Sequence, residues 1–401
     1  MPGWMPAFVT PQLVTSLVVI LIVLHVIAVG AMYLVLLERR IAAWIQDRCG
    51  PNRVGPKGLF QPIADSIKLL VKEDYTPKHA DRFLFVLAPA LTVIPALIGF
   101  VIIPWAGVLT IGGEEVIIAG ADINIGVIYL VAVTSLGVYG VALGGWASNN
   151  KYSFFGSLRA TAQMVSYEIP LGLALLAVIL TAGTLRPSEL IQQQLDGQWF
   201  LVHQPVAAVL FFTCLLAEAN RLPFDLAEAE SELVGGWHTE YSSMKWVLFF
   251  LGEYGHLVVG SGFFTVLFLG GWSINPFAGG GSADLPMAGG LGMILLQCVI
   301  VFGKVFCLIC LTMALRWTLP RFRYDQLMRL AWEGLIPTAL LVLLVTSMFV
   351  FLGWAQDWMW AGSLGIVLVI WLLQPLLARR VSSNHRVPLA GSRFSPLSEE
   401  E

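Results

Sequence analysis

Three carboxyl residues of this sequence lie within or at the ends of long apolar segments, where an ionisable side chain is costly. They are Glu168, Glu218 and Glu253, and Lys304 lies within a further apolar run. A charge at the centre of a membrane costs about 2.5–3.5 kcal/mol on insertion scales, so such residues are rare without a role. Each acid could simply pair with a neighbouring helix or subunit. Taken together, however, carboxyls spaced by water can exchange protons, and we favour a proton path.

More acids gather in the loop from Ala217 to Lys245, which holds Arg221 as its one cation before Lys245. Apolar residues such as Phe224, Leu226 and Trp237 alternate with these acids. A solvated acidic face stays an alternative, but the interleaved apolar residues favour a partly buried acidic cluster. The acids of the loop are Glu218, Asp225, Glu228, Glu230, Glu232 and Glu240.

Two further loops carry charge among aromatic and apolar residues. The loop from Glu38 to Arg82 contains Leu59, Ile63, Ile67, Leu70 and Val71 at helical spacing, which predicts an amphipathic helix in the membrane interface. Pattern alone does not separate a functional element from a surface helix that only anchors to lipid. In the loop from Arg316 to Glu333, Arg321 and Arg323 are typical of cationic anchors that bind anionic lipid head groups.

The elements that must position these residues are membrane helices. Apolar residues make up 57% of the 401 residues and charged residues only 12%, and the mean hydropathy is +0.78. Runs of roughly 20 apolar residues predict transmembrane helices, and the alternation expected of barrel strands is absent. We therefore predict an all-α polytopic helix bundle with nine spans, near 13–37, 83–105, 124–146, 163–182, 205–222, 245–270, 291–315, 335–353 and 361–378.

The distribution of cations predicts how this bundle crosses the membrane. With these nine spans, all of the 23 Lys and Arg residues except Arg186 and Lys304 fall in loops or ends on one side. Cytoplasmic loops collect such residues, so we expect the N-terminus outside and the C-terminus in the cytoplasm. No internal repeat is apparent, which argues against transporters built from two inverted halves. The chain is expected to form a single membrane domain, 1–401.

Cofactor motifs give no sign of a redox centre in this chain. Cys307 and Cys310 form a C-x-x-C, but it lies within an apolar helix and has no second pair or nearby His, so packing residues are the simpler interpretation. Glycine patterns for nucleotide binding are also absent. We expect no metal and no cofactor bound by this chain.

Four loop motifs resemble those of the H subunit of the proton-pumping NADH:quinone oxidoreductase, respiratory complex I. The first reads E-R-R-x5-Q-D-R-x-G-P-N-R-V-G-P-x-G-L-x-Q-P-x-A-D-x-I-K-L-L, and the second is N-N-K-Y-S-x3-S-L-R-A-x-A-Q-M-V-S-Y-E-I-P-L-G. The third is A-E-A-N-R-x-P-F-D-L-x-E-A-E-S-E-L-V-G-G-x-H-T-E-Y-S, and the fourth is P-R-F-R-Y-D-Q-L-M-R-L-x-W. They occur in the order of that family, and the resemblance extends over a core of residues 1–355.

This resemblance implies a role at the junction between a peripheral redox arm and a proton-pumping membrane arm. A protein of this family would form the entrance of a quinone chamber in a bacterial plasma (cell inner) membrane. The residues implied to line or shape that chamber are Arg39, Arg48, Asp65, Arg221, Trp246, Phe250 and Arg316. Those implied to carry protons or charge away from it are Glu38, Glu168, Glu218, Asp225, Glu228, Glu230 and Glu253.

The implied partners are the other subunits of the complex, membrane lipids and a quinone substrate, with no nucleic acid. FMN and the iron–sulfur clusters would lie on partner subunits, so no activity is expected of this chain alone. One departure concerns residues 356–401, because family members usually end soon after the eighth helix. Here an apolar run predicts a ninth helix, followed by a basic cytoplasmic tail.

Three other functions remain as alternatives. A homologous subunit of a membrane-bound hydrogenase or formate hydrogenlyase would keep parts of the loop pattern, and a nickel-binding subunit encoded nearby would favour it. A free-standing ion transporter would be active when reconstituted alone. A purely structural anchor would leave the intramembrane acids unexplained.

Overall fold

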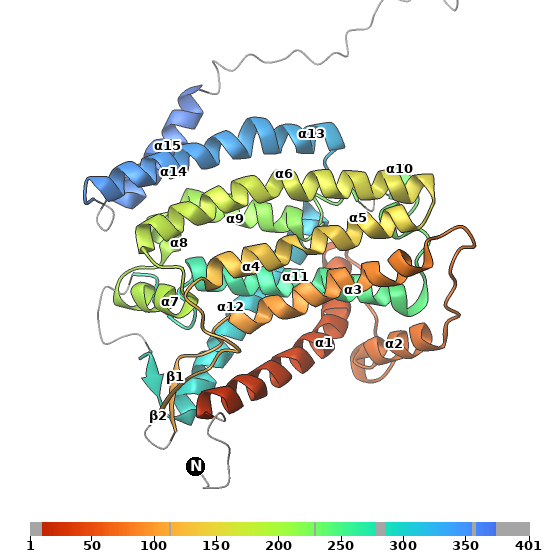
Figure 1. Cartoon of the computed structure of the whole chain (residues 1–401), viewed down its shortest axis with the longest axis horizontal. Coiled ribbons are helices and arrows are strands. Elements are labelled where there is room, and N and C mark those ends of the chain that lie inside the picture. The colour runs from red at the N-terminus through yellow and green to blue at the C-terminus, as the bar shows by residue number, and fades with distance from the viewer. Residues whose placement is uncertain (1–9, 112–113, 228–229, 278–284, 355–357, 374–401) are drawn as a thin grey trace, which may run out of the picture.

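The computed structural model describes residues 10–111, 114–227, 230–277, 285–354 and 358–373, and these form a bundle of α-helices with few strands (Figure 1). The longer helices are α1 (Pro11–Ile45), α2 (Gln61–Val71), α3 (Arg82–Gly99), α4 (Gly126–Ser135), α5 (Gly137–Ala147), α6 (Lys151–Ala182), α7 (Pro187–Asp196), α9 (Pro205–Glu218), α11 (Ser243–Phe268), α12 (Leu291–Thr318), α14 (Ile336–Phe351) and α15 (Met359–Leu373). Short helical turns are η1 (Pro56–Gly58), η2 (Phe100–Ile102), α8 (Phe200–His203), α10 (Glu230–Leu233), η3 (Gly236–His238), α13 (Tyr324–Arg329) and η4 (Leu330–Leu335).

The predicted membrane spans are found as helices, and the prediction of an all-α polytopic bundle is confirmed. In the described parts of the chain, 7 helices are long and apolar enough to cross a membrane, and Pro205–Glu218 and Met359–Leu372 are shorter apolar helices. The last of these corresponds to the predicted ninth span, whose end, together with the basic tail, lies outside the described residues. The predicted amphipathic helix is α2, in which Ile63, Ile67 and Leu70 are exposed on its surface.

Local sequence signals explain where several helices begin. Thr10 caps α1 by accepting a hydrogen bond from the Leu13 backbone N–H, and Pro11 takes the first turn, where its missing N–H costs nothing. Asp81 caps α3 and Asn150 caps α6 in the same way. At the far end of α6, Gly183 adopts a left-handed conformation (φ 69°), which glycine reaches without steric cost.

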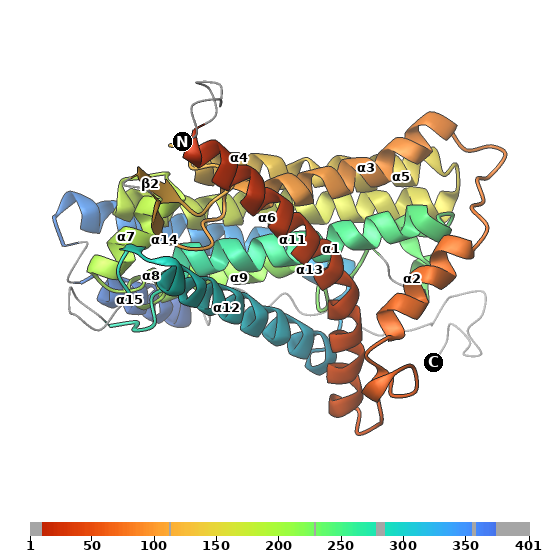
Figure 2. The same cartoon turned by 90° about the horizontal axis from the view of Figure 1, so that it is seen from below.

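Most of the long helices run side by side along the bundle, whereas α1 crosses the others obliquely (Figures 1 and 2). Helix α3 packs between α5 and α11, and α6 packs against α5, α9 and α14. Helix α12 contacts both α1 and α11. Helix α2 lies at the Ile45 end of α1, outside the bundle (Figure 2).

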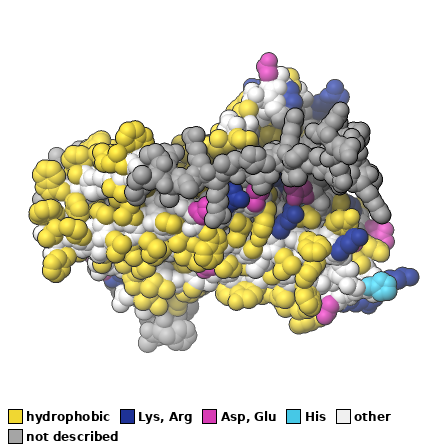
Figure 3. All heavy atoms as spheres, turned by 90° about the horizontal axis from the view of Figure 1, so that it is seen from above, with side chains coloured by type: hydrophobic (Ala, Val, Ile, Leu, Met, Phe, Trp, Pro, Cys, Tyr) yellow, Lys and Arg dark blue, Asp and Glu magenta, His cyan; other side chains and the backbone are white. Residues whose placement is uncertain are grey.

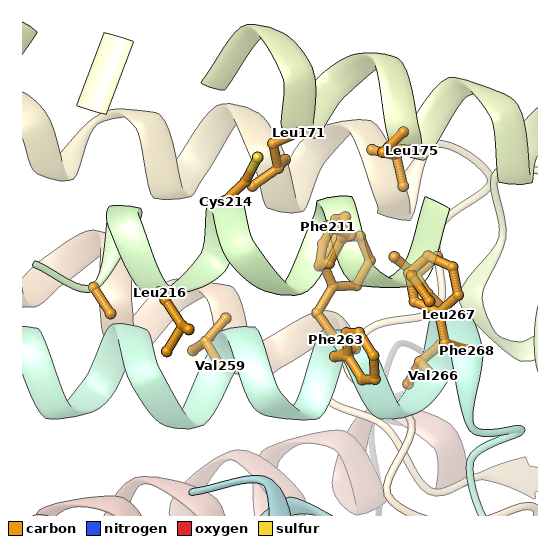
Figure 4. Packing of buried hydrophobic residues seen from close by; sticks show 14 of the residues in the cluster. Leu171, Leu175, Phe211, Cys214, Leu216, Val259, Phe263, Val266, Leu267 and Phe268 are labelled. Carbon is orange, nitrogen blue, oxygen red and sulfur yellow. The ribbon is translucent and has the colours of Figure 1, made fainter. Parts of the chain in front are cut away.

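The core lies where α6, α9 and α11 meet (Figure 4). The ring of Phe211 on α9 lies 5.7 Å from those of Phe263 and Phe268 on α11. Leu171 and Leu175 of α6 and Cys214 of α9 extend this cluster on the other side. Aromatic pairs at such distances add about 0.5–1.5 kcal/mol each to the burial of their area.

The strands of the described fold form one small sheet, which lies at the end of the bundle opposite α2 (Figure 1). Strand β1 (Val108–Ile111) pairs antiparallel with β2 (Glu114–Ile117) and parallel with β3 (Ala288–Gly289). The helix α7 follows at the same end, where Asp122 binds Arg186 at 2.7 Å. The connections at this end of the bundle are therefore ordered by strand pairing and by an ion pair.

The outer surface of the bundle is largely apolar. Leu17, Leu21 and Ile22 on α1 are each more than half exposed, as are Leu344 on α14 and Leu364 on α15. In the view of Figure 3, apolar side chains cover most of the left of the molecule, and most of the visible cationic side chains lie to the right. An apolar belt of this kind is expected of a protein surrounded by lipid and partner helices.

Candidate functional site

Glu38 is the centre of a buried polar cluster between α1, α11 and α12. Its carboxylate accepts hydrogen bonds from the guanidinium of Arg316 on α12 and from the hydroxyl of Tyr254 on α11. Arg221 lies 3.6 Å from the same carboxylate and 3.9 Å from that of Glu253. Because Glu38 and Arg221 are both buried, these charges interact in a medium that screens them little.

The fold brings these side chains together from distant parts of the chain. Glu38 lies near the C-terminal end of α1, and Arg316 lies in the last turn of α12, which contacts α1. Arg221 follows directly after α9 ends, and its guanidinium lies 4.3 Å from the ring centroid of Tyr254. This cation–π contact adds to the ion pairs and fixes the position of the guanidinium.

A cavity of about 200 Å³ opens beside this cluster, between α1, α2 and α11. Its polar residues include Arg39 of α1 and Asp65 of α2, whose side chains form an ion pair at 2.9 Å. Apolar walls come from Val35, Trp246 and Phe250, among others. The cavity is therefore apolar over most of its wall, with a charged pair on one side, a combination suited to an amphipathic ligand.

An aromatic row on α11 connects the cavity with the buried cluster. The rings of Trp246 and Phe250 stack at 4.9 Å, and the ring of Phe250 lies 4.8 Å from that of Tyr254. Residues four apart lie above one another on a helix, so the three rings share one face. Tyr254 both lines the cavity and donates to Glu38, so it is the link between the two.

The ion pair at the cavity is permanently charged at ordinary pH. Partial burial raises the pKa of Asp65, but the charge of Arg39 and the hydrogen bonds from Lys68 and Gln61 outweigh it and hold the pKa below its usual range. Asp65 therefore stays a carboxylate near neutral pH and cannot act as a proton donor there. Its role in the cavity is that of a fixed negative charge beside a fixed positive one.

Glu168 and Glu218 form a second polar group deeper in the bundle. Glu168 on α6 accepts a hydrogen bond from Ser135, the last residue of α4. Both carboxyls line one small cavity of about 10 Å³ together with Thr134 and Ser135. Glu218 and Arg221 lie only three residues apart in the sequence, but the helix ends at Glu218, and the contacts of Arg221 given above are with Glu38 and Glu253.

A residue that the sequence analysis missed also belongs to this region. His256 on α11 lines, with Glu218 and Thr134, another cavity of about 20 Å³. Its Nε2 atom is buried and makes no hydrogen bond within the described part of the chain. The signal in the sequence was its position three residues after Glu253, which places both side chains on one face of the helix.

The remaining predicted site residues lie elsewhere. Arg48 is exposed and binds the side chain of Gln46, away from the lining of the cavity. Asp225 is buried, and Arg321 lies 3.4 Å from its carboxylate.

Glu228 lies outside the described residues. Glu230 begins α10, but its side chain lies outside the described part of the structure. Of the other loop acids, Glu232 pairs with Arg159 at 2.5 Å and Glu240 accepts a hydrogen bond from Asn150.

No group of three His, Cys, Asp or Glu residues that could hold a metal ion occurs within the described ranges. The cavity and the buried charges described above can supply binding, charge compensation and proton transfer. An amphipathic molecule could enter the apolar cavity beside Arg39 and Asp65. The carboxyls further inside could take up or release protons.

Comparison with known proteins identifies relatives over most of the chain. The family model of NADH dehydrogenase matches residues 18–347. The H 1 subunit of the NADH-quinone oxidoreductase of Geobacter metallireducens is 48% identical over 331 residues, which cover 82% of this chain and 94% of that protein. The H subunit of Protochlamydia amoebophila is 47% identical, covering 80% and 93%, and the H 1 subunit of Cytophaga hutchinsonii is 44% identical, covering 84% and 96%.

Proposed function

This chain belongs to the NADH dehydrogenase family and is an H subunit of NADH-quinone oxidoreductase, and on that premise we propose that it admits the quinone and conducts protons away from the site of its reduction. The observation that carries the proposal is the apolar cavity between α1, α2 and α11, joined through Tyr254 to the buried carboxylate of Glu38. The homologous hydrogenase subunit and the free-standing transporter are not favoured, because the relatives are named as subunits of this oxidoreductase.

The cavity suits a quinone because its two kinds of wall match the two parts of that molecule. The isoprenoid tail is apolar and packs against groups such as Val35, Trp246 and Phe250. The head group carries carbonyl oxygens, which accept hydrogen bonds from cations such as Arg39. Because Asp65 holds the Arg39 guanidinium in place at 2.9 Å, the polar end of the cavity is preorganised.

The carboxyls further inside suit proton conduction. Reduction of a quinone to a quinol consumes protons, and it changes the charge close to Glu38, Arg221 and Arg316. Buried charged groups respond to such a change because their surroundings screen it little. Glu253, Glu218 and Glu168 would then pass protons between the cluster and the interior of the bundle.

The membrane setting and the partners follow from the same proposal. We place the chain in the plasma (inner) membrane of a bacterium, with its N-terminus outside and its C-terminus in the cytoplasm. Electrons would arrive from FMN and iron–sulfur clusters on partner subunits, and other membrane subunits and lipids would surround the apolar belt. The chain itself would hold no redox cofactor and would be inactive alone.

Filling the cavity tests the quinone part of the proposal. Val35 lines the cavity, so Val35→Phe in the assembled complex should raise the KM for quinone about tenfold, within the range that misfit in an apolar pocket produces. NADH oxidation by ferricyanide, a hydrophilic acceptor that does not need the cavity, should be unchanged. Steady-state kinetics with both acceptors provides the measurement.

The matched control for this experiment is Val29→Phe on the same helix. Val29 is 47% exposed on the surface of α1, away from the lining of the cavity. It should leave the KM for quinone unaltered. Equal kinetics for the two variants would contradict the assignment of the cavity to quinone.

Removing one carboxyl tests the proton part. Glu218→Gln keeps the size and hydrogen bonding of the side chain but cannot release a proton, so quinone-coupled turnover and proton pumping should fall about tenfold or more. Pumping by inverted membrane vesicles, measured with a pH-sensitive dye, reports the effect. Glu115→Gln on the exposed face of β2 is the control. Wild-type pumping by assembled Glu218→Gln enzyme would rule out the path.

A further inference from the structure

His256 is a half-buried histidine of α11 that neighbours a carboxyl of each group, and its Nε2 atom is buried. On α11 it is one turn after Glu253, which lies 3.9 Å from Arg221. On its other side it shares a cavity with Glu218 of α9. Among the contacts described above, no hydrogen bond or ion pair joins Glu253 directly to Glu218. A proton path through both carboxyls therefore needs an intermediate group.

The surroundings of His256 give its imidazole room but leave one polar atom unsatisfied. A side chain at Gly137 would place its Cβ 2.8 Å from the His256 Nε2 atom, so the absence of a side chain there makes space for the ring. The Nε2 atom is buried and has no hydrogen-bond partner among the residues that the structure describes. A buried polar group without a partner costs about 1–3 kcal/mol, which favours a water molecule beside it.

The cavity beside His256 is large enough for that water. Its volume is about 20 Å³, and a water molecule needs roughly 10–15 Å³ measured in the same way. The polar side chains among its lining residues are His256, Glu218 and Thr134, which could together supply the bonds that a buried water makes. The remaining lining is apolar and includes Leu130, Leu171, Leu215, Phe211 and Phe263.

We propose that His256 relays protons between Glu253 and Glu218 through one water molecule held in this cavity. In a transfer towards Glu218, one ring nitrogen takes up a proton from Glu253 while the other gives one to the water, which passes a proton on to Glu218. The imidazole is then neutral in the opposite tautomer, and a turn of the ring restores the first tautomer before the next transfer. A neutral imidazole can do this because one nitrogen donates and the other accepts. The titratable side chains that line the cavity are Glu218 and His256, and Glu168 lines the adjoining one.

This inference rests on the proton path proposed above, and the experiment separates the two. His256→Gln retains hydrogen bonding at the position of the ring but does not titrate, and His256→Leu removes both properties. Both are compared with Glu218→Gln and with His25→Gln, a matched control in which an exposed histidine of α1 is replaced. The intact complex in inverted membrane vesicles is assayed for NADH-driven quinone reduction and for protons pumped per NADH, across a range of pH.

A relay requires that both His256 variants pump poorly. We expect a loss of about a hundredfold in coupled turnover for His256→Gln and His256→Leu, at the lower end of what a positioned proton-transfer group contributes. The pH profile should lose its wild-type shape, and His25→Gln should behave as wild type. Normal pumping by His256→Gln together with poor pumping by His256→Leu would show that His256 has a structural role, and it would overturn the relay.

The remaining outcomes are equally decisive. Normal pumping by both His256 variants, with Glu218→Gln impaired, would overturn the relay and leave the proton path intact. Normal pumping by Glu218→Gln as well would overturn the path itself. In each case, subunit composition on native gels confirms that the complex has assembled.

Discussion

Glu38 is the residue on which most polar contacts of the buried cluster converge. Arg316 and Tyr254 donate to its carboxylate, and Arg221 lies 3.6 Å from it. A buried carboxylate is tolerated at such a position because cations and hydrogen bonds replace the water that it loses. The same contacts couple the cavity, through Tyr254, to the charges further inside.

Replacing Glu38 should therefore destabilise the protein more than replacing a surface acid. Glu38→Gln leaves buried guanidinium groups with less compensating charge, and breaking a buried pair costs about 3–5 kcal/mol. Thermal unfolding of the purified complex should show this loss. Glu232→Gln, which breaks the half-exposed pair with Arg159, should cost about 0–1 kcal/mol. Similar losses for the two variants would show that the cluster around Glu38 is not a stabilising unit.

The residue types of the site could be predicted from the sequence, but their pairing could not. Glu168, Glu218 and Glu253 were identified because a charge in an apolar segment is costly. Glu38 was expected in the path and Arg316 in the chamber, whereas the structure joins the two directly. That contact depends on how α1 and α12 cross, which local sequence does not encode. His256 was missed because a single histidine in an apolar helix forms no motif, and its spacing of three residues from Glu253 was the one signal that it gave.

Among the helices, α11 and α12 are joined by an intramembrane cation. Lys304 on α12 donates to the backbone carbonyls of Leu269, Gly271 and Ser273, at 2.5, 2.8 and 2.5 Å, and its Nζ lies 4.2 Å from the Trp199 ring centroid. These carbonyls follow the end of α11, where a helix carries partial negative charge. Lys304 therefore acts as a cap supplied by a neighbouring helix.

Removal of this cap should loosen the end of α11. Lys304→Met keeps the apolar part of the side chain and loses hydrogen bonds from a charged group, each worth about 1.5–3 kcal/mol. The midpoint temperature of thermal unfolding should fall. The rate of quinone reduction at low temperature should be retained, because the cavity is lined by other residues. Lys151→Met, at the exposed start of α6, is the control. An unchanged midpoint for Lys304→Met would argue against the cap.

The positions of the helices could be predicted because long apolar runs admit few alternatives, whereas their ends and breaks could not. The run predicted at 124–146 is divided at Leu136 into α4 and α5. Helix α6 begins at Lys151, twelve residues before the predicted span at 163, since its first turns pack against η3 rather than lipid. Ser153 and Gly156 make that contact. Such extensions depend on tertiary packing, and the hydropathy averaged over a segment of sequence gives no information about tertiary contacts.

For the whole chain, the arrangement of charge predicts how the bundle lies in the membrane. The basic loops around α2 lie at one end, and the small sheet and α7 lie at the other (Figure 1). Cations collect on the cytoplasmic side, so the sheet should face outward. Arg186, at the end of the bundle with the sheet, has a local partner, since it pairs with Asp122 at 2.7 Å. The hydrogen bond to Asp122 raises the pKa of Arg186, so the guanidinium stays charged.

Labelling of introduced cysteines tests this orientation. Glu189 at the start of α7 and Lys72 at the end of α2 are both exposed. In intact cells a membrane-impermeant maleimide should label Glu189→Cys and leave Lys72→Cys unreacted until the membrane is opened. The parent protein, which carries five cysteines, measures the background. The reverse pattern of labelling would invert the proposed topology.

The shortness of α9 has an electrical consequence. Its 14 residues span about 21 Å, less than the roughly 30 Å of a hydrocarbon core, and α6, α11, α14 and α15 surround it. Glu218, at its end, is therefore expected below the surface of the membrane, where part of the transmembrane voltage has already dropped. Moving one elementary charge across the whole membrane changes its free energy by about 2.3 kcal/mol when the voltage is 100 mV. A proton that reaches Glu218 from the loop between Ala217 and Lys245 would thus perform or absorb electrical work. The rate of that proton transfer should therefore respond to the membrane voltage.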